Sequence, residues 1–303
     1  MKNPTVDILM ATFNGARYIA EQLESVIRQT YPDWRLLVHD DGSSDDTVTI
    51  VKRFAAADGR IQLLDDGVHE LGAARNFMHL LKYSTSPLCM FCDQDDIWLE
   101  EKVGKLVQAI RGEHGPAAAY ANAVYYRNGS TMRKATDIHP SRLRNMLFMN
   151  AGIQGCSLIF NRSLADRVKS YDGFLAMHDH LITLAAITFG KLIYLDEVLT
   201  LYRQHEHNHT SDHHMGRLKR LRAFCNSRNA VIDRVHFEAN RSFYRYFQPQ
   251  LTQKDRRLFQ AYFDYVEKQT VLGRLWIIWK HKFELGDRRG LLAVKTLIRR
   301  AIN

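Results

Sequence analysis

The sequence contains no long hydrophobic run, and this argues against a membrane-spanning helix. None of its apolar stretches approaches the ~20 consecutive apolar residues that such a helix requires. The basic and apolar regions of a signal peptide are also missing, because Asp7 and Asn14 interrupt the only candidate segment near the start. We therefore expect a cytoplasmic protein.

Cysteine is also scarce, which argues against a disulfide-stabilised fold. The four cysteines occupy positions 89, 92, 156 and 225, too few for a disulfide scaffold. Cys89 and Cys92 form a CxxC pair in an extended apolar run, whereas a redox CxxC begins a helix and a zinc site needs a second pair. We interpret the cysteines as reduced core residues.

The glycine-rich phosphate-binding loops GxGxxG and GxxxxGK[ST] are both absent. A diphosphate ligand would therefore need another source of positive charge, and a bound cation is the simplest candidate. A calcium-binding EF-hand is excluded as well. A loop that begins at Asp41 has Asp46 and Lys52 where glycine and glutamate are needed, and a loop that begins at Asp93 fails at the same positions.

The composition is that of a soluble globular protein, with 46% hydrophobic and 25% charged residues among 303. The net charge of +9 is distributed unevenly. Residues 1–216 contain 22 Lys and Arg against 26 Asp and Glu, whereas residues 217–303 contain 20 against 7. The positive charge therefore belongs to the C-terminal segment, which needs an explanation of its own.

Strand-length apolar runs alternate four times with helical periodicity in the first 110 residues. The predicted strands are 6–11, 34–38, 61–64 and 88–92, and the predicted helices are 16–28, 45–54, 73–83 and 99–110. This alternation predicts an α/β fold with a mainly parallel sheet flanked by helices.

The pattern is weaker beyond residue 116. We predict strands at 117–126, 157–160, 192–195 and 199–202, helices at 142–149, 163–171 and 180–189, and a polar loop at 128–140. From residue 215 onward helical spacing dominates, and we predict a helical extension without strands.

Polar residues follow three of the predicted strands, at residues 12–15, 40–43 and 93–96. Because the carboxyl ends of parallel strands share one edge of a sheet, these residues are expected to converge on one crevice. Asp93, Asp95 and Asp96 repel one another, and a divalent cation with oxygen ligands would hold them together. The alternative is a solvated acidic turn that caps the next helix.

Four motifs in this order resemble glycosyltransferase family 2, whose catalytic domain has the GT-A fold. They are ATFNG at 11–15, DDGSSDDT at 40–47, GAARN at 72–76 and DQDD at 93–96. Two later segments, MHD at 177–179 and LYRQH at 201–205 followed by Asn208, resemble the rhamnosyltransferase branch. The resemblance extends from about residue 5 to residue 205.

The resemblance implies a role for each motif residue. The donor nucleotide would be bound by Thr12, Asn14, Asp41, Arg75, Asn76 and Asp93. Asp41 would accept a hydrogen bond from the base; the alternative is an acid near a helix N-terminus. Arg75 would hold phosphate or ribose, or else is a surface charge.

The metal and the chemistry are assigned in the same way. Asp95 and His205 would hold Mg²⁺ or Mn²⁺, while Asp96 and Arg203 would face the donor sugar or diphosphate. Asp179 resembles the general base that takes the acceptor proton.

Two alternatives to the assignment of Asp179 remain, and the histidines after His205 need an interpretation of their own. Asp172 is a rival base, and Asp179 is alternatively a helix cap. The nearby histidines 207, 209, 213 and 214 are interpreted as part of a polar loop and not as a zinc site.

The implied organisation is a catalytic domain at 1–214, with a nucleotide-sugar half at about 1–115 and an acceptor half at about 116–214. The implied activity is inverting transfer of L-rhamnose from dTDP-rhamnose to a growing surface polysaccharide or lipid-linked glycan. A UDP-hexose or UDP-HexNAc donor is the alternative within the family. A nucleotidyltransferase would need a basic glycine-rich phosphate loop near the start, and this sequence has none. A non-catalytic glycan-binding or nucleic-acid-binding role would leave Asp93, Asp95 and Asp179 without a shared purpose.

The extension at 215–303 contains basic amphipathic segments. Residues 272–283 and 291–302 mix aliphatic residues and Trp with Arg and Lys, as suits an anionic membrane surface. We therefore predict a peripheral position at the inner face of the cell membrane and no nucleic-acid partner. Alternatively, these helices pack on the catalytic domain or form a dimer.

Overall fold

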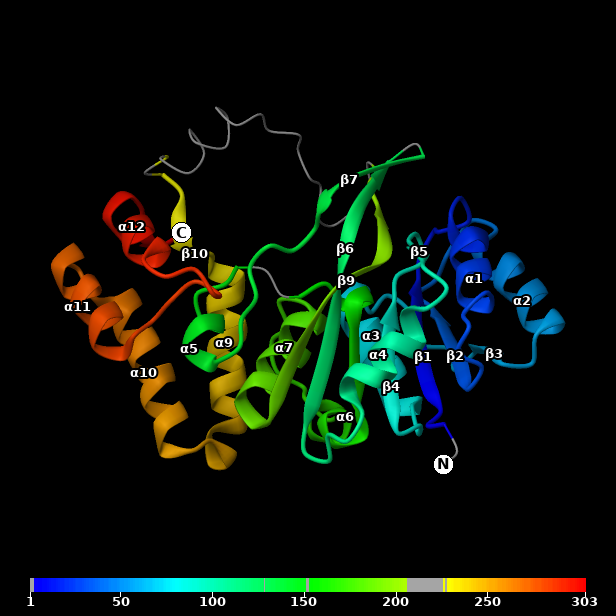
Figure 1. Ribbon diagram of the computed structural model, residues 1–303, viewed down its shortest axis with the longest axis horizontal. Coiled ribbons are helices and arrows are strands. Elements are labelled where there is room, and N and C mark those ends of the chain that lie inside the picture. Colours follow the sequence, from blue (N-terminus) through cyan, green and yellow to red (C-terminus); the bar gives the residue numbers. More distant parts are fainter. Residues whose placement is uncertain (1–2, 128, 151–152, 206–225, 227) are drawn as a thin grey trace.

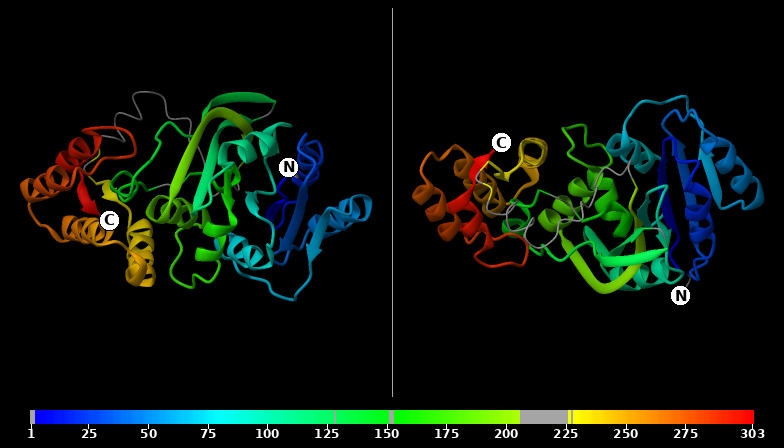
Figure 2. Two further views of the ribbon diagram at one scale, coloured as in Figure 1. Left: turned by 60° about the horizontal axis from the view of Figure 1, so that its bottom comes forward. Right: turned by 90° about the horizontal axis from the view of Figure 1, so that it is seen from above.

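The computed structural model describes residues 3–127, 129–150, 153–205, 226 and 228–303. A large mixed sheet has the strand order β3-β2-β1-β4-β8-β6-β9-β5, with β7 paired to β6. Helices cover both faces of this sheet, and the helices of the C-terminal segment lie at the end of the molecule opposite β1–β3 (Figure 1; Figure 2).

The N-terminal part of the sheet is parallel, as the alternating pattern predicts. It contains β1 (Val6–Thr12), β2 (Trp34–Asp40), β3 (Ile61–Leu64) and β4 (Leu88–Cys92). Thr12 pairs with Asp40, and Met10 pairs with Cys92. The carboxyl ends of β1, β2 and β4 therefore meet at one edge of the sheet.

Side chains that alternate along these strands enter two cores. Ile8 and Met10 of β1 pack in one core with α1 (Ile19–Ile27), α2 (Thr47–Ala57) and α4 (Lys102–Ile110). Leu9 enters the other core with α3 (Ala73–Tyr83), α6 (Arg162–Val168) and α7 (His178–Phe189). Burial of both faces explains why the strands are continuously apolar.

The second half of the sheet is mixed. β8 (Leu158–Asn161) is antiparallel to β4 and to β6 (Ala117–Arg127), while β9 (Lys191–Arg203) runs parallel to β6. Two short helices, α5 (Leu143–Met146) and the 3-10 turn Gly155–Ser157, lie in the connection between β6 and β8.

Two predictions for this half are wrong, and one strand that pairs with it is missing from the predictions. The segment predicted as a loop at 128–140 contains β7 (Ser130–Lys134), which forms a hairpin with β6. The two strands predicted at 192–195 and 199–202 are one continuous strand, β9, whose register with β6 shifts near Asn122. The short strand β5 (Ile97–Trp98) was not predicted; it follows the acidic residues directly and pairs with β9.

The C-terminal segment is largely helical, with α9 (Arg234–Phe247), α10 (Gln253–Glu267), α11 (Val271–His281) and α12 (Leu291–Ile298), and a 3-10 turn at Gln248–Gln250. The prediction that it lacks strands is wrong, because β10 (Ala230–Ile232) pairs in parallel with β11 (Arg300–Ile302). Apolar residues of α9–α12 belong to the same core as α3 and α7, so the extension packs on the catalytic part of the chain.

Candidate active site

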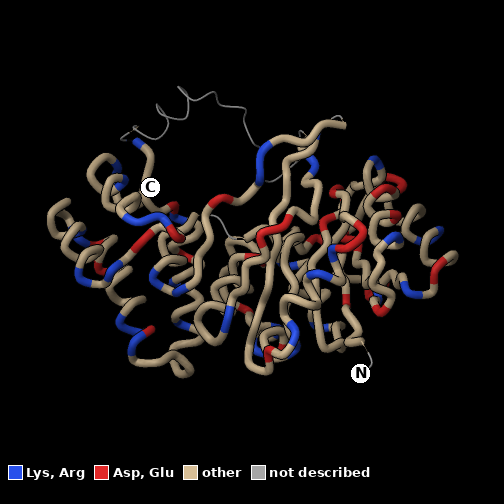
Figure 3. Tube along the Cα trace, in the orientation of Figure 1, with Lys and Arg blue, Asp and Glu red and all other residues tan. Residues whose placement is uncertain are grey.

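Residues 93–96, called here the acidic loop, leave β4 at the shared strand edge. Oxygen atoms of Asp93 and Asp96 and the sulfur of Cys156 lie within 4.8 Å of one another. Asp96 is 0% exposed, and its Oδ1 accepts a hydrogen bond from the Arg203 amide at 3.0 Å. Among the described residues its Oδ2 has no hydrogen-bond partner. Acidic residues occur in the middle of the molecule and at its β1–β3 end, and basic residues are frequent on the C-terminal helices (Figure 3).

The acids of this loop destabilise one another when no positive charge lies between them. Burial, followed by the charges of Asp95 and Asp179, raises the pKa of Asp93 to about 7. Burial, followed by the charges of Asp95 and Asp93, raises the pKa of Asp96 well above its usual value. A buried carboxylate oxygen without a partner, beside further oxygen donors, fits a hard divalent cation.

Lys102 is a buried counter-charge that the sequence interpretation missed. Its Nζ donates hydrogen bonds to the Cys156 carbonyl at 2.6 Å and to Thr200 Oγ1 at 2.7 Å, and lies 3.7 Å from the centre of the Trp98 ring. Burial lowers its pKa to about 8, although the nearby Cys156, Cys92 and acidic-loop charges oppose that shift. An ammonium group therefore lies behind the acidic loop and balances part of its charge.

Asp95 and His205, the two predicted metal ligands, are adjacent. His205 Nε2 lies 2.7 Å from Asp95 Oδ2, and the His205 ring stacks on Tyr18 at 4.8 Å. Arg203 donates from Nε to the Asp95 carbonyl at 2.7 Å and forms an ion pair with Glu21. The end of β9 is thus fastened to the acidic loop.

The expectation that Asp96 faces the donor sugar requires correction. Its side chain is fully buried and supports β9 through the Arg203 amide. Arg203 in turn contacts the main chain of the acidic loop, with its guanidinium 4.9 Å from the Tyr18 ring centre. Asp96 and Arg203 therefore both help to fix the conformation of the acidic loop, which carries Asp95.

Asp179 lies in the first turn of α7. Burial raises its pKa to about 6, although backbone hydrogen bonds from His180 and Gly155 and the charge of His236 oppose this. Because its charge also raises the pKa of Asp93, the two carboxylates belong to one electrostatic cluster. The N-cap residue of α7 is Met177, so Asp179 does not occupy the capping position proposed as its alternative role.

The loops after β1 and β2 are fastened to each other. Thr12 Oγ1 donates to Asp40 Oδ1 at 2.8 Å. The Asn14 amide donates to Ser43 Oγ at 2.8 Å, and Asn14 Oδ1 accepts from the Ser44 amide at 2.8 Å. Asn14 has a φ of 47°, a left-handed conformation that asparagine tolerates better than most residues. The Asp40 carboxylate thus supports both loops.

Asp41 and Asn76 connect the end of β2 to the segment that precedes α3 and to α3 itself. Asp41 is buried, and its two carboxylate oxygens accept from the amides of Leu71 and Gly72 at 2.8 and 2.7 Å. The expected contact of Asn76 with the nucleotide needs correction, because Asn76 is 1% exposed and its amide group bonds to His39. Arg75 is exposed at the start of α3.

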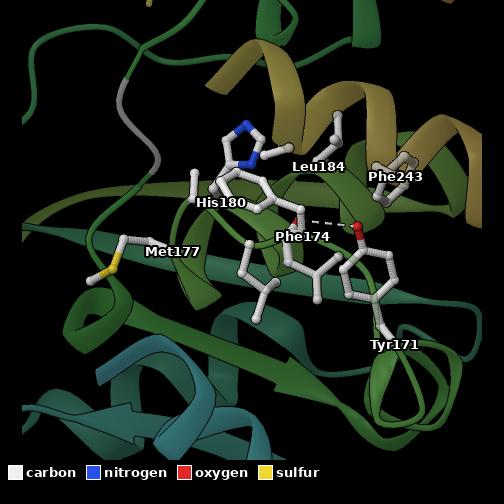
Figure 4. Close-up of a pocket in the computed structure, with 10 residues that line it drawn as sticks. Tyr171, Phe174, Met177, His180, Leu184 and Phe243 are labelled. Carbon is white, nitrogen blue, oxygen red and sulfur yellow. Dashed lines mark hydrogen bonds between the residues drawn. The ribbon is translucent and has the colours of Figure 1, made fainter. Parts of the chain in front are cut away.

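A small pocket lies between α7 and α9, and Figure 4 shows Tyr171, Phe174, Met177 and His180 on its lining. Tyr171 Oη donates to the Phe174 carbonyl at 3.2 Å. Asp172, the rival base, is exposed next to this pocket. The predicted histidine-rich loop after His205 lies outside the described residues.

A sequence model described as Glycosyl transferase family 2 matches residues 7–168, and this chain belongs to that family. The fold described above is GT-A, as the resemblance predicted.

Relatives with curated functions use different donors. A dTDP-rhamnosyl transferase, RfbG, of Shigella flexneri is 28% identical over 66% of this chain and 72% of its own length. An Escherichia coli protein, WfgD, named UDP-Glc:alpha-D-GlcNAc-diphosphoundecaprenol beta-1,3-glucosyltransferase, is 33% identical over 54% of this chain and 63% of its own length. The chain is therefore a glycosyltransferase, in a family whose members are named for different donors.

Solved structures share the fold. The mannosyltransferase PcManGT from Pyrobaculum calidifontis, in complex with GDP-Man and Mn²⁺, has a TM-score of 0.56 and 18% identity over 93% of this chain and 74% of its own. TarS residues 1–349 from S. aureus, in complex with UDP-GlcNAc, has a TM-score of 0.56 and 17% identity over 88% of this chain and 82% of its own.

Proposed function

We propose that this chain transfers a sugar from a nucleoside-diphosphate donor to a hydroxyl group with inversion at the anomeric carbon. The observation that carries the proposal is the single electrostatic cluster formed by the acidic loop and Asp179 at the carboxyl edge of the sheet. Inverting transfer needs a carboxylate base on one side of the reacting carbon and positive charge for the leaving diphosphate on the other.

The residues of the acidic loop fit a divalent cation, Mg²⁺ or Mn²⁺. Asp95 and His205 would hold it, with Asp93 beside them near the ribose. Carboxylate oxygens are the ligands these ions prefer, and imidazole is tolerated by Mn²⁺. When bound, such a cation supplies positive charge that stabilises the departing diphosphate.

The chain's own groups have distinct tasks in this proposal. Asp179 accepts the proton of the attacking hydroxyl group at a carboxylate oxygen. Its pKa of about 6 is above that of an ordinary carboxylic acid, so it is a stronger base and is still ionised at neutral pH. Thr12, Asn14 and Asp41 shape the nucleotide wall, and exposed Arg75 is available to a phosphate or the ribose.

The donor that we propose is dTDP-rhamnose, from which L-rhamnose is transferred. Two observations support it. The relative named a dTDP-rhamnosyl transferase matches 66% of this chain, and the segments at 177–179 and 201–205 resemble the rhamnosyltransferase branch. The second candidate is a UDP-glucose donor, because the WfgD relative is named for it.

The donor is tested by incubating the protein with dTDP-rhamnose, UDP-glucose, UDP-GlcNAc or GDP-mannose and Mn²⁺, and measuring nucleoside-diphosphate release. We expect the fastest release from dTDP-rhamnose. Faster release from UDP-glucose would replace the rhamnose assignment and leave the glycosyltransferase mechanism intact. No release from any nucleotide sugar would contradict the mechanism as well.

The acceptor that we propose is a lipid-linked glycan at a membrane surface. Two relatives are named for acceptors on diphosphoundecaprenol or PP-undecaprenol. Large apolar side chains protrude from α11 and α12: Leu272 is 80% exposed, Trp276 53%, Trp279 77% and Leu297 62%. Among the described residues, no helix combines the length and apolarity needed to cross a bilayer.

These side chains form one surface, called here the α11–α12 face. Leu272, Trp276 and Trp279 follow helical spacing along one side of α11. Lys280 lies 4.4 Å from the Trp276 ring centre, and further basic residues flank both helices. An apolar face with Trp and a basic border matches the interface of an anionic bilayer. This supports a peripheral position at the inner face of the cell membrane.

Sedimentation with liposomes that contain an anionic lipid tests this surface. We expect the wild type to sediment and a Trp276→Ser/Trp279→Ser variant to remain in the supernatant. A Phe174→Ser variant is the matched control, because Phe174 is also an exposed aromatic residue, 48% exposed, but lies outside the α11–α12 face. Equal sedimentation of all three proteins would contradict the proposed membrane contact.

A further inference from the structure

A second cluster of metal-ligand side chains lies on the nucleotide side of the sheet, apart from the acidic loop. It contains His39 at the end of β2, Asp66 in the loop after β3 and His79 on α3. One ligand atom of each residue lies within 4.8 Å of the other two. None of these residues belongs to a motif on which the family resemblance rests.

The neighbouring Asn76 side chain fixes the hydrogen positions on His39. Asn76 Nδ2 donates to the His39 carbonyl at 3.2 Å, so its Oδ1 is the atom that faces His39 Nδ1, at 2.7 Å. Because Oδ1 is only an acceptor, Nδ1 carries a proton. In a neutral imidazole the lone pair is then on Nε2, and Nε2 points at Asp66 Oδ1 from 3.3 Å.

A lone pair that faces a carboxylate oxygen is unfavourable unless a proton or a metal cation lies between the two. His39 is 1% exposed, whereas the Asp66 carboxylate lies at the surface. His79 Nε2 approaches the other oxygen, Asp66 Oδ2, at 2.6 Å. The ligand atoms of the two histidines therefore both lie beside the Asp66 carboxylate.

We propose that His39, Asp66 and His79 bind a transition-metal cation of the Zn²⁺ class. Two imidazole nitrogens and one carboxylate oxygen are a common zinc ligand set, with water at the fourth position. The Asn76 bond to His39 is the outer-shell contact that orients a ligating histidine. The Tyr83 hydroxyl group, 2.7 Å from Asp66 Oδ2, orients the carboxylate in the same way.

This site would join three parts of the nucleotide wall. His39 is followed directly by Asp40 and Asp41, and Asp66 precedes the loop whose amides bind the Asp41 carboxylate. A metal at this position would fasten β2, the β3–α3 loop and α3 together. The role is structural, and it is independent of the donor cation at the acidic loop.

Zinc titration of the metal-free protein tests the site. The protein is treated with EDTA, returned to zinc-free buffer containing excess Mg²⁺, and titrated with Zn²⁺ by calorimetry. Because the chain has 14 histidines, each of which offers a zinc ligand, the readout is a difference in stoichiometry. Compared with the wild type, His79→Gln and Asp66→Asn are expected to lose one equivalent, with affinity at this site weakened by at least about 100-fold.

Two control variants separate this site from the others. His114→Gln removes an exposed histidine elsewhere, and Asp95→Asn alters the acidic loop; both are expected to keep the equivalent. Visible absorption of tetrahedral Co²⁺ in the wild type gives a readout that needs no variant. Unchanged zinc stoichiometry in both His79→Gln and Asp66→Asn, or no zinc binding and no Co²⁺ signal in the wild type, would overturn the proposal.

Discussion

The Asp179→Asn substitution separates a catalytic from a structural role for this carboxylate. Asparagine keeps the shape of the side chain but does not accept a proton from an attacking hydroxyl group. Loss of a general base lowers kcat by roughly 10²–10⁴-fold. This corresponds to about 3–5 kcal/mol of activation free energy.

Asp179→Asn should raise the free energy of unfolding at neutral pH, although it lowers kcat. Burial raises the pKa of Asp179 to about 6 from 3.8, so the ionised form is disfavoured in the folded state. The raised pKa means that stability falls as the pH rises from about 4 to about 6. At neutral pH the variant is therefore expected to be more stable than the wild type, by up to about 3 kcal/mol.

The assays are nucleoside-diphosphate release in the presence of an acceptor and thermal unfolding at pH 7. Wild-type activity is expected to rise with pH through about 6, as Asp179 loses its proton, and the variant should lack this rise. The matched control is Asp172→Asn at the exposed rival base. The reasoning is refuted if Asp179→Asn keeps more than about a tenth of the activity while Asp172→Asn loses it.

Three further substitutions test the site and the sheet that carries it. Lys102→Met should lower the free energy of unfolding by about 3–5 kcal/mol in denaturant titrations, because it removes the buried ammonium beside Thr200. Asp7→Asn should cost about 2 kcal/mol at pH 7, with the difference from wild type disappearing in acid, because hydrogen bonds lower the pKa of Asp7 against its burial and their stabilisation is lost as it protonates. Gly155→Ala should lower the melting temperature and kcat, because a Cβ atom there would lie 2.4 Å from His178 Nε2, next to Asp179.

The N-terminal half of the fold follows from local pattern, and the later half does not. Strands buried on both faces, such as β1 and β4, are continuously apolar and easily recognised. β7 is polar because it is an exposed strand of a hairpin, so its sequence resembles a loop. β10 and β11 lie far apart in the sequence and pair only because the helices between them bring them together.

The sequence allows the residues of the site to be predicted, but not most of the contacts between them. The strand-end pattern placed Asp93 and Asp95 at one edge, and the structure puts them there. The burial of Asp96 and Asn76 depends on contacts with Arg203 and His39 that no local pattern reveals. Lys102 has no place in the sequence interpretation, because nothing in the sequence shows that its Nζ reaches the Cys156 carbonyl.

The dependence of donor cleavage on a divalent cation held by Asp95 tests the central claim most directly. Nucleoside-diphosphate release from dTDP-rhamnose is measured for the wild type and for Asp95→Asn, after EDTA treatment and across a Mn²⁺ titration. We predict that EDTA abolishes release by the wild type, that Mn²⁺ restores it, and that Asp95→Asn needs at least about tenfold more Mn²⁺ or remains inactive. Full activity of the EDTA-treated wild type, or an unchanged Mn²⁺ requirement in Asp95→Asn, would contradict the account.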